Sequence, residues 1–261
     1  VKTVEKLNKE RGNHIIYEYQ IHFLNKDKKF SKNTDEIISD TNGAWLLPTC
    51  IDIDNDGYLD LLKLELKEKG GLIKRQQYKF LLYLSTNHGH FLNKPFQIIE
   101  TSDFPLGKEM LIDIDGDEKK DLILIHPETK GYSLGSILNT YLEKGINAEI
   151  RILPFKMGVG FSKNEIIRKK IKIKFIVGIP ISLSGDFNGD GMKDLLVIDK
   201  DRIKIYPFLK SNKRFSSYPK INLKIGDIDN YIVKDLNEDN RSDLIVFSGD
   251  KIKTIFFKRF N

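Results

Sequence analysis

Four nine-residue segments, each with an oxygen-bearing side chain at its first, third, fifth and ninth positions, constrain the fold of this chain most strongly. They read DIDNDGYLD, DIDGDEKKD, DFNGDGMKD and DLNEDNRSD, and they span residues 52–60, 113–121, 186–194 and 235–243. We call them loops one to four and number their positions 1 to 9. Ca²⁺ is a hard cation that takes about six to eight oxygen ligands, which a tightly turned loop of this composition can offer. The repeated spacing predicts up to four bound calcium ions.

The same ligand set is predicted in each loop, namely the side chains at positions 1, 3, 5 and 9 and the backbone carbonyl at position 7. These ligands are Asp52, Asp54, Asp56, Tyr58 and Asp60; Asp113, Asp115, Asp117, Lys119 and Asp121; Asp186, Asn188, Asp190, Met192 and Asp194; and Asp235, Asn237, Asp239, Arg241 and Asp243. Gly57, Gly191 and Asn240 at position 6 suit the positive φ of a tight turn. Loop two instead has Glu118 there and its glycine at position 4, so the sequence leaves open whether loop two binds calcium.

The residues after each loop exclude an EF-hand. That motif needs a bidentate Glu at position 12, before a helix, whereas position 12 here is Lys63, Leu124, Val197 or Val246. Position 9 instead opens a short apolar run, such as DLLVI, and an extended segment such as YIVK enters the loop. Short apolar runs bounded by turn residues are typical of strands. Each loop is therefore predicted to join two strands.

A strand, the pattern D-x-[DN]-x-D-G-x-x-D and a following D-L-[LI] together resemble the FG-GAP repeats, also called VCBS repeats, of integrin α-subunit heads and of many bacterial surface and secreted proteins. The resemblance implies an all-β chain of four-stranded antiparallel blades of a β-propeller. It places the calcium loop between the first and second strands of each blade. The function that it implies is a calcium-binding scaffold for extracellular recognition of a protein or carbohydrate ligand, as in adhesion.

The loop spacing lies in the range in which propeller blades repeat. We predict half a blade at residues 1–40, whole blades at about residues 41–100, 101–176 and 177–226, and an incomplete blade at residues 227–261. A closed propeller of this kind has about seven or eight blades, and the chain does not begin with Met. We therefore expect residues 1–261 to be one propeller region of a longer polypeptide, either an open arc or part of a closed ring.

Signatures of catalysis are missing from the sequence. GVGFSK lacks the third glycine of a dinucleotide fingerprint, and neither a phosphate-binding loop nor a GxSxG elbow occurs. His88 and His90, in NHGH, are interpreted as a solvated turn. Paired carboxylates can hydrolyse glycosides, but four clusters with one shared ligand spacing are not what separate active sites would require. The sequence predicts that the chain is not an enzyme.

The charge of the chain bears on its partners. The net charge is +6, and apart from the fourteen loop aspartates the chain holds 43 basic and 23 acidic residues. Such a surplus can attract an anionic partner, although dispersed lysines more often only solvate a surface. Residues 67–75 (KEKGGLIKR) and 126–136 are predicted as long connections that carry recognition, and the first suits an anionic ligand. Specific nucleic-acid binding is not predicted.

The resemblance also leaves other settings open. It implies an extracellular or cell-surface location, and no run approaches the eighteen apolar residues of a transmembrane segment. Toxin-complex B-subunits carry such repeats as well, near segments to which GNHIIYEYQ is similar. An accessory domain of a polysaccharide-degrading enzyme is a further alternative.

Overall fold

A computed structural model describes most of the chain, and it is all-β. It covers residues 2–11, 14–23, 36–40, 49–68, 77–85, 91, 94–128, 146–173, 181–199 and 201–260, with the backbone alone described up to residue 40. Within these ranges the structure has antiparallel strands, no α-helix and only two short 3-10 helices, η1 (Gly107–Glu109) and η2 (Lys210–Asn212). The predicted all-β class is confirmed.

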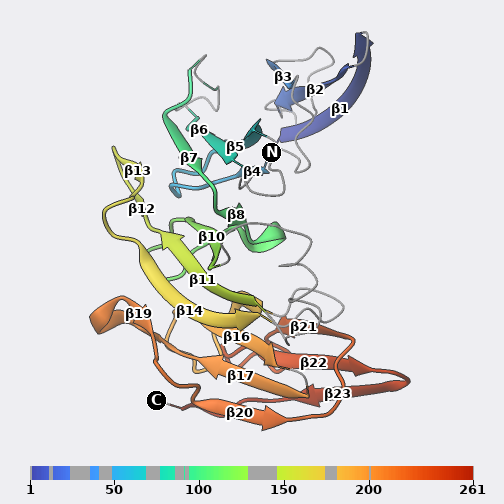
Figure 1. The fold of residues 1–261 in the computed structure, drawn as a ribbon, viewed down its shortest axis with the longest axis vertical. Coiled ribbons are helices and arrows are strands. Elements are labelled where there is room, and N and C mark those ends of the chain that lie inside the picture. The colour runs from blue at the N-terminus through green and yellow to red at the C-terminus, as the bar shows by residue number, and fades with distance from the viewer. Residues whose placement is uncertain are drawn as a thin grey trace. The chain divides into compact units, whose positions relative to one another are not determined.

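Two compact units make up the chain, and each is coloured by residue number in Figure 1. Unit one comprises Val1–Gly70 and Arg75–Ser102, and unit two comprises Gly71–Lys74 and Asp103–Asn261. Loop one belongs to unit one, and loops two, three and four belong to unit two.

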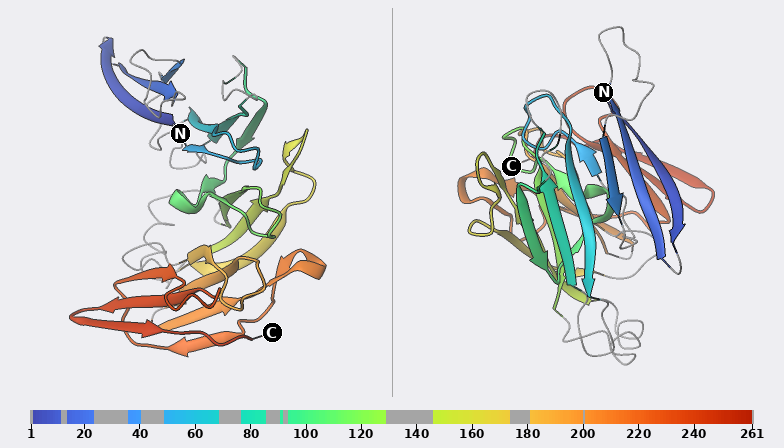
Figure 2. Two further views of the ribbon diagram at one scale, coloured as in Figure 1. Left: turned by 180° about the vertical axis from the view of Figure 1, so that it is seen from behind. Right: turned by 90° about the horizontal axis from the view of Figure 1, so that it is seen from above.

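Unit one holds two antiparallel sheets. The first has the order β1 (Lys2–Arg11), β2 (His14–Phe23), β3 (Glu36–Asp40), and the second has the order β4 (Thr49–Ile51), β5 (Asp60–Glu68), β6 (Gln77–Tyr83), β7 (Gln97–Thr101). The cyan and green strands of the second sheet lie side by side in the right-hand view of Figure 2. Loop one joins β4 to β5, its first two strands.

Unit two holds three larger sheets and two small hairpins. In its first sheet β8 (Phe104–Pro105) and β9 (Leu111–Ile112) pair with β10 (Asp121–Pro127), which pairs with β11 (Ile146–Leu153) and then β14 (Ile167–Ile173). The second sheet has the order β15 (Ile181–Gly185), β16 (Asp194–Asp199), β17 (Arg202–Tyr206), β20 (Ile221–Lys224). The third has the order β21 (Asn230–Lys234), β22 (Asp243–Ser248), β23 (Lys251–Ile255), and the hairpins are β12 (Phe155–Lys156) with β13 (Gly160–Phe161) and β18 (Phe208–Leu209) with β19 (Arg214–Phe215).

The three sheets of unit two pack on one another, with β16 in the middle sheet contributing to both shared cores. Successive side chains of a strand point to opposite faces. Leu195 and Val197 of β16 therefore join the core shared with the first sheet, while Leu196 and Ile198 join the core shared with the third sheet. All four side chains are buried. A strand that is buried on both faces needs the continuous apolar run that follows each loop.

Every loop leads directly into a strand. Asp60, Asp121, Asp194 and Asp243, at position 9, are the first residues of β5, β10, β16 and β22. The strand before each loop pairs with the strand after it. The prediction that the loops join strands is confirmed.

Some sequence-based predictions fall on residues that the structure does not describe. Residues 69–76, most of the basic connection, lie outside the described residues, as do residues 129–136 and both His88 and His90. Among the residues that are described, no helix has the length and apolar character needed to cross a bilayer.

A pair of isoleucines tests the assignment of the core. Ile205 is fully buried in the core beside the third sheet, whereas Ile252 is 68% exposed on β23. Ile205→Ala should lower the free energy of unfolding by about 2–5 kcal/mol through the cavity that it leaves, and Ile252→Ala by less than about 0.5 kcal/mol. Urea unfolding measures both, and equal losses would contradict this packing.

Candidate metal centre

The ninth residue of each loop is a buried carboxylate that begins the second strand and accepts hydrogen bonds from two other segments. Asp60, Asp121, Asp194 and Asp243 are at most 2% exposed. One oxygen of each accepts the backbone N–H of position 2, at 2.8 Å from Ile53, 3.1 Å from Ile114, 2.9 Å from Phe187 and 3.1 Å from Leu236. The other accepts an N–H from the segment after the third strand, at 2.9 Å from Ser85, 3.1 Å from Phe155, 3.1 Å from Phe208 and 3.3 Å from Phe257.

Burial also changes the acidity of these carboxyl groups. It raises the pKa of Asp60 to about 6 and the pKa of Asp121 and Asp194 to about 7, and the carboxylates at positions 1, 3 or 5 of the same loop raise them further. The two backbone N–H donors act in the opposite direction. A bound cation would offset the burial, because an opposite charge close by favours the ionised form.

The first residue of each loop organises the turn. Its carboxylate accepts the backbone N–H groups of positions 5 and 6 in every loop and also of position 4 in loops two and three. In loop three, for example, Asp186 accepts from Gly189 at 2.7 Å and from Gly191 at 2.8 Å. The loop backbone is thereby wrapped around the first carboxylate.

Position 5 continues the same pattern. The position 5 side chain accepts the N–H of position 7 in all four loops, at 2.8–3.0 Å. As a result the side chains at positions 1, 3 and 5 converge, and in loops one and two the carboxylate oxygens lie within 4.8 Å of one another, in the clusters Asp52, Asp54, Asp56 and Asp113, Asp115, Asp117. These are the distances at which several oxygens can bind one cation.

Loop two contains an unpaired buried acceptor. Among the described residues Asp115 Oδ1 is buried and has no hydrogen-bond partner. Burial, reinforced by the charge of Asp117, raises the pKa of Asp115. A buried polar atom without a partner is rare in a native protein and is commonly explained by water or an ion, so its presence fits a cation in loop two.

The backbone of loop two does not depart from that of the other loops. Positions 4 and 6 both have positive φ in each loop, at 62° and 88° for Asn55 and Gly57, 75° and 69° for Gly116 and Glu118, 75° and 86° for Gly189 and Gly191, and 60° and 64° for Glu238 and Asn240. The glycine at position 4 of loop two therefore also meets a left-handed requirement, and Glu118 adopts the remaining left-handed conformation at a modest cost. Its altered sequence leaves the loop geometry unchanged.

Loops three and four repeat one arrangement. In each, a strand leads into a loop of this geometry, and a buried carboxylate begins the next strand. Residues 186–246 match the family model of the FG-GAP-like repeat. The predicted resemblance is confirmed over these residues. A comparison with curated proteins and one with solved structures gave no match.

The matched FG-GAP-like repeat runs from loop three to the strand after loop four, so it includes two loops that differ at position 7. Each position 7 residue donates its backbone N–H to position 5, but the four side chains differ in their exposure and their contacts. Tyr58 is 40% exposed, and Met192 is 8% exposed. Lys119 Nζ lies 3.5 Å from Asp117 Oδ2, and the guanidinium of Arg241 pairs with Asp239.

Neighbouring loops in unit two are joined to one another. Lys193 N–H of loop three donates to the Ile114 carbonyl of loop two at 3.0 Å, and Ser242 N–H of loop four donates to the Asp186 carbonyl of loop three at 2.6 Å. Asp186 N–H in turn donates to the Ser242 hydroxyl oxygen at 3.0 Å. The three loops therefore form one hydrogen-bonded row within unit two.

Glycine at position 4 is explained by these contacts. A Cβ on Gly116 would lie 3.1 Å from the Gly191 carbonyl oxygen and 3.5 Å from the Met192 side chain. A Cβ on Gly189 would lie 3.0 Å from Cγ of Arg241. In each case the next loop packs its position 7 side chain onto the bare glycine.

The sequence analysis did not find the donors that follow the third strand. Phe155, Phe208 and Phe257 lie far along the chain from the loops, and no ligand spacing points to them. A signal was present, because Phe208 and Phe257 each come fourteen residues after the ninth residue of a loop, and Phe155 and Phe208 both follow a proline. Their backbone N–H groups complete the buried carboxylate.

Removal of one buried carboxylate tests its structural role. In a chelator, Asp194→Ala should lower the free energy of unfolding by about 2–4 kcal/mol, because the buried N–H groups of Phe187 and Phe208 lose their acceptor. Asp190→Ala, at an exposed position of the same loop, should cost clearly less under these conditions. Urea unfolding compares them, and a larger loss for Asp190→Ala would reject the assignment.

The raised pKa values predict a pH dependence of the metal-free protein. The ordinary value for these carboxyls is 3.8, and the folded values for Asp121 and Asp194 are about 7. Between these values the native state binds more protons than the unfolded state, so the contribution of these groups to stability falls as the pH rises from about 4 to about 7.

Urea unfolding in chelator at pH 5 and pH 8 measures this effect. Asp194→Asn should reduce the loss of stability between the two pH values, and Asp190→Asn serves as the control in the same loop. An unchanged loss in Asp194→Asn would show that its carboxyl does not titrate in this range.

Proposed function

We propose that this chain is a calcium-binding, non-catalytic β-propeller module that acts outside the cell as a scaffold for recognition of a protein or carbohydrate. The observation that carries the proposal is the convergence of carboxylate oxygens at positions 1, 3 and 5, within 4.8 Å of one another in loops one and two. Oxygen-only donors favour a hard cation such as Ca²⁺ over zinc or copper, which prefer nitrogen and sulfur.

The fit is supported by the hydrogen bonding of the loops. Backbone N–H groups hold the carboxylate and amide oxygens of loop three in place, so its ligand side chains are oriented before an ion arrives. Asp115 Oδ1 offers a buried oxygen that the described residues leave without a partner. When bound, calcium would supply the positive charge that these crowded carboxylates lack.

A non-catalytic role follows from the composition of the sites. Each loop offers its own oxygen ligands within nine residues, which leaves little open coordination for a substrate. The loops instead connect the first two strands of their sheets, and a cation there would hold the connection closed. The predicted absence of enzymatic activity is retained as part of this proposal.

The propeller is supported by the arrangement of the sheets. The second sheet of unit two is a four-stranded antiparallel meander with its loop between the first two strands, which is the blade that the resemblance to FG-GAP repeats implies. Residues 186–246 match the FG-GAP-like repeat. The sheets of unit two pack successively on one another. Closure into a ring and the limits of the blades remain predictions.

An extracellular or cell-surface location suits the ion. Calcium sites of extracellular modules have dissociation constants on the order of 0.1–1 mM, so such sites fill outside the cell and stay nearly empty at cytosolic calcium. The proposed partner is a protein or carbohydrate. The basic residues of the connection at 67–75 would suit an anionic one.

Calcium should stabilise the protein measurably. At about ten to twenty times its dissociation constant, calcium adds roughly 1.4–1.8 kcal/mol for each occupied site by mass action. Each kcal/mol should raise the melting temperature by roughly 2–4 °C. Thermal unfolding in excess chelator and in millimolar calcium, with magnesium as the control ion, measures the effect. If the melting temperature is the same in chelator and in calcium, the proposed function is wrong.

A further inference from the structure

Loop four has a basic side chain, Arg241, paired with its position 5 carboxylate, whereas position 7 of loop three is the uncharged Met192. We infer that Arg241 occupies the role of calcium in loop four, so that loop four closes without a metal ion while loop three requires one. This inference rests on the proposed calcium binding and specifies which loops take part in it.

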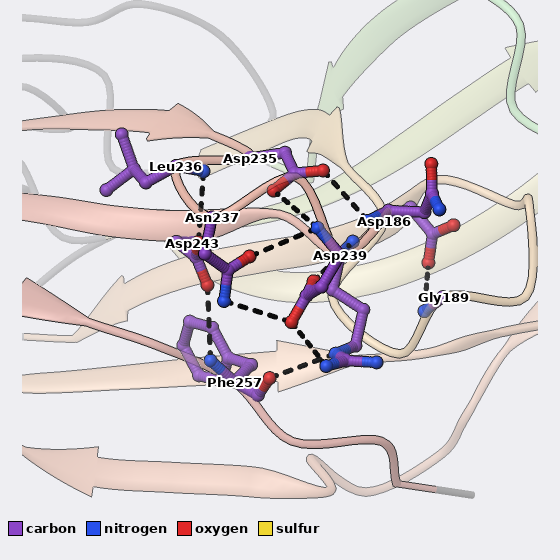
Figure 3. A network of polar contacts seen from close by, with 10 residues as sticks. Asp186, Gly189, Asp235, Leu236, Asn237, Asp239, Asp243 and Phe257 are labelled. Carbon is purple, nitrogen blue, oxygen red and sulfur yellow. Dashed lines mark hydrogen bonds and ion pairs between the residues drawn. The ribbon is translucent and has the colours of Figure 1, made fainter.

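The carboxylate of Asp239, at position 5, is already fully engaged (Figure 3). Its Oδ1 accepts the backbone N–H of Arg241 at 3.0 Å, and its Oδ2 accepts the Asn237 side-chain amide at 3.0 Å. The same Oδ2 forms a close ion pair with the Arg241 guanidinium. A calcium ion would have to displace the guanidinium to reach this oxygen.

Arg241 is held in place from two further sides. Its Nε donates to the Phe257 carbonyl at 3.0 Å, and Phe257 N–H donates to the buried Asp243 at 3.3 Å. The stem of Arg241 packs against Gly189 of loop three, where a Cβ would approach its Cγ to 3.0 Å. A guanidinium anchored in this way carries a permanent positive charge and several fixed donors.

Loop three provides the matched comparison. Its sequence has the same ligand types, with Asn188 at position 3, and Asn188 donates to Asp190 Oδ2 at 3.0 Å just as Asn237 does to Asp239. Met192 at position 7 brings no charge, and it packs against Gly116 of loop two as Arg241 packs against Gly189. The two loops thus share the hydrogen bonds that their position 1, 3 and 5 side chains accept from positions 5, 6 and 7, and at position 7 they differ in charge.

Loop two is an intermediate case. Lys119 Nζ lies 3.5 Å from Asp117 Oδ2 and 3.2 Å from the Asp117 carbonyl, but no described contact fixes it on a third side. In addition, the described structure leaves the buried Asp115 Oδ1 without a hydrogen bond. Loop two thus has a basic side chain beside its position 5 carboxylate and still keeps a buried ligand oxygen, at position 3, without a hydrogen bond.

Counting bound calcium in variants of the complete chain tests the inference. Calorimetric titration should give Asp190→Ala one ion fewer than the wild type, Asp239→Ala the same number as the wild type, and Arg241→Met one ion more. Arg241→Met copies the residue that loop three has at this position. Loss of an ion in Asp239→Ala, or an unchanged count in Arg241→Met, would overturn the inference.

Thermal unfolding separates this inference from the proposed function. In chelator, Arg241→Met should melt below the wild type by roughly 2 °C or more, because loop four loses its internal cation, and calcium should recover the difference. If the wild type binds no calcium at all, the proposed function fails, and the chelator measurement alone then decides the role of Arg241. A variant that melts at or above the wild type in chelator would refute that role.

Discussion

Each repeat depends on the buried carboxylate at the end of its loop. It begins the second strand of its sheet and accepts hydrogen bonds from the start of the loop and from the segment after the third strand. Hydrogen bonds to an ionised acceptor are about twice as strong as neutral ones, and burial excludes the water that would compete for them. One side chain therefore connects the start of the loop, the second strand and the segment after the third strand.

That arrangement creates an electrostatic problem, because three more oxygen-bearing side chains gather beside the buried carboxylate. The backbone N–H groups around position 1 offset part of the negative charge, as N–H groups do in anion-binding nests. The rise in the pKa of Asp121 and Asp194 shows that these donors do not remove the cost of burial. A cation close to the loop would lower that cost, and either a bound ion or a basic side chain such as Arg241 could supply it.

The sequence was sufficient to predict the parts of this design that depend on local spacing. Carboxylates at positions 1, 3, 5 and 9 and an apolar run from position 9 predicted a loop between two strands, and each loop is built in that way. It was not sufficient for features that depend on contacts between distant residues. The donor Phe155 lies 34 residues after the carboxylate that it bonds, and the fourteen-residue spacing of Phe208 and Phe257 gains meaning only once their hydrogen bonds are known. The glycine at position 4 in loops two and three also reflects packing by the following loop.

The contacts of a position 7 side chain could not be predicted from the loop sequence either. They nevertheless determine how one loop affects its neighbour. Arginine, lysine, methionine and tyrosine all leave the backbone N–H free to bond position 5, so the loop forms whichever is present. Ser242 follows Arg241 directly and bonds the backbone of Asp186, the residue around which loop three is wound. A loop four that closes on its own arginine would therefore hold the first ligand of loop three in place before calcium binds. Because pre-ordered ligands lose less entropy on binding, the internal cation of one loop would increase the calcium affinity of its neighbour.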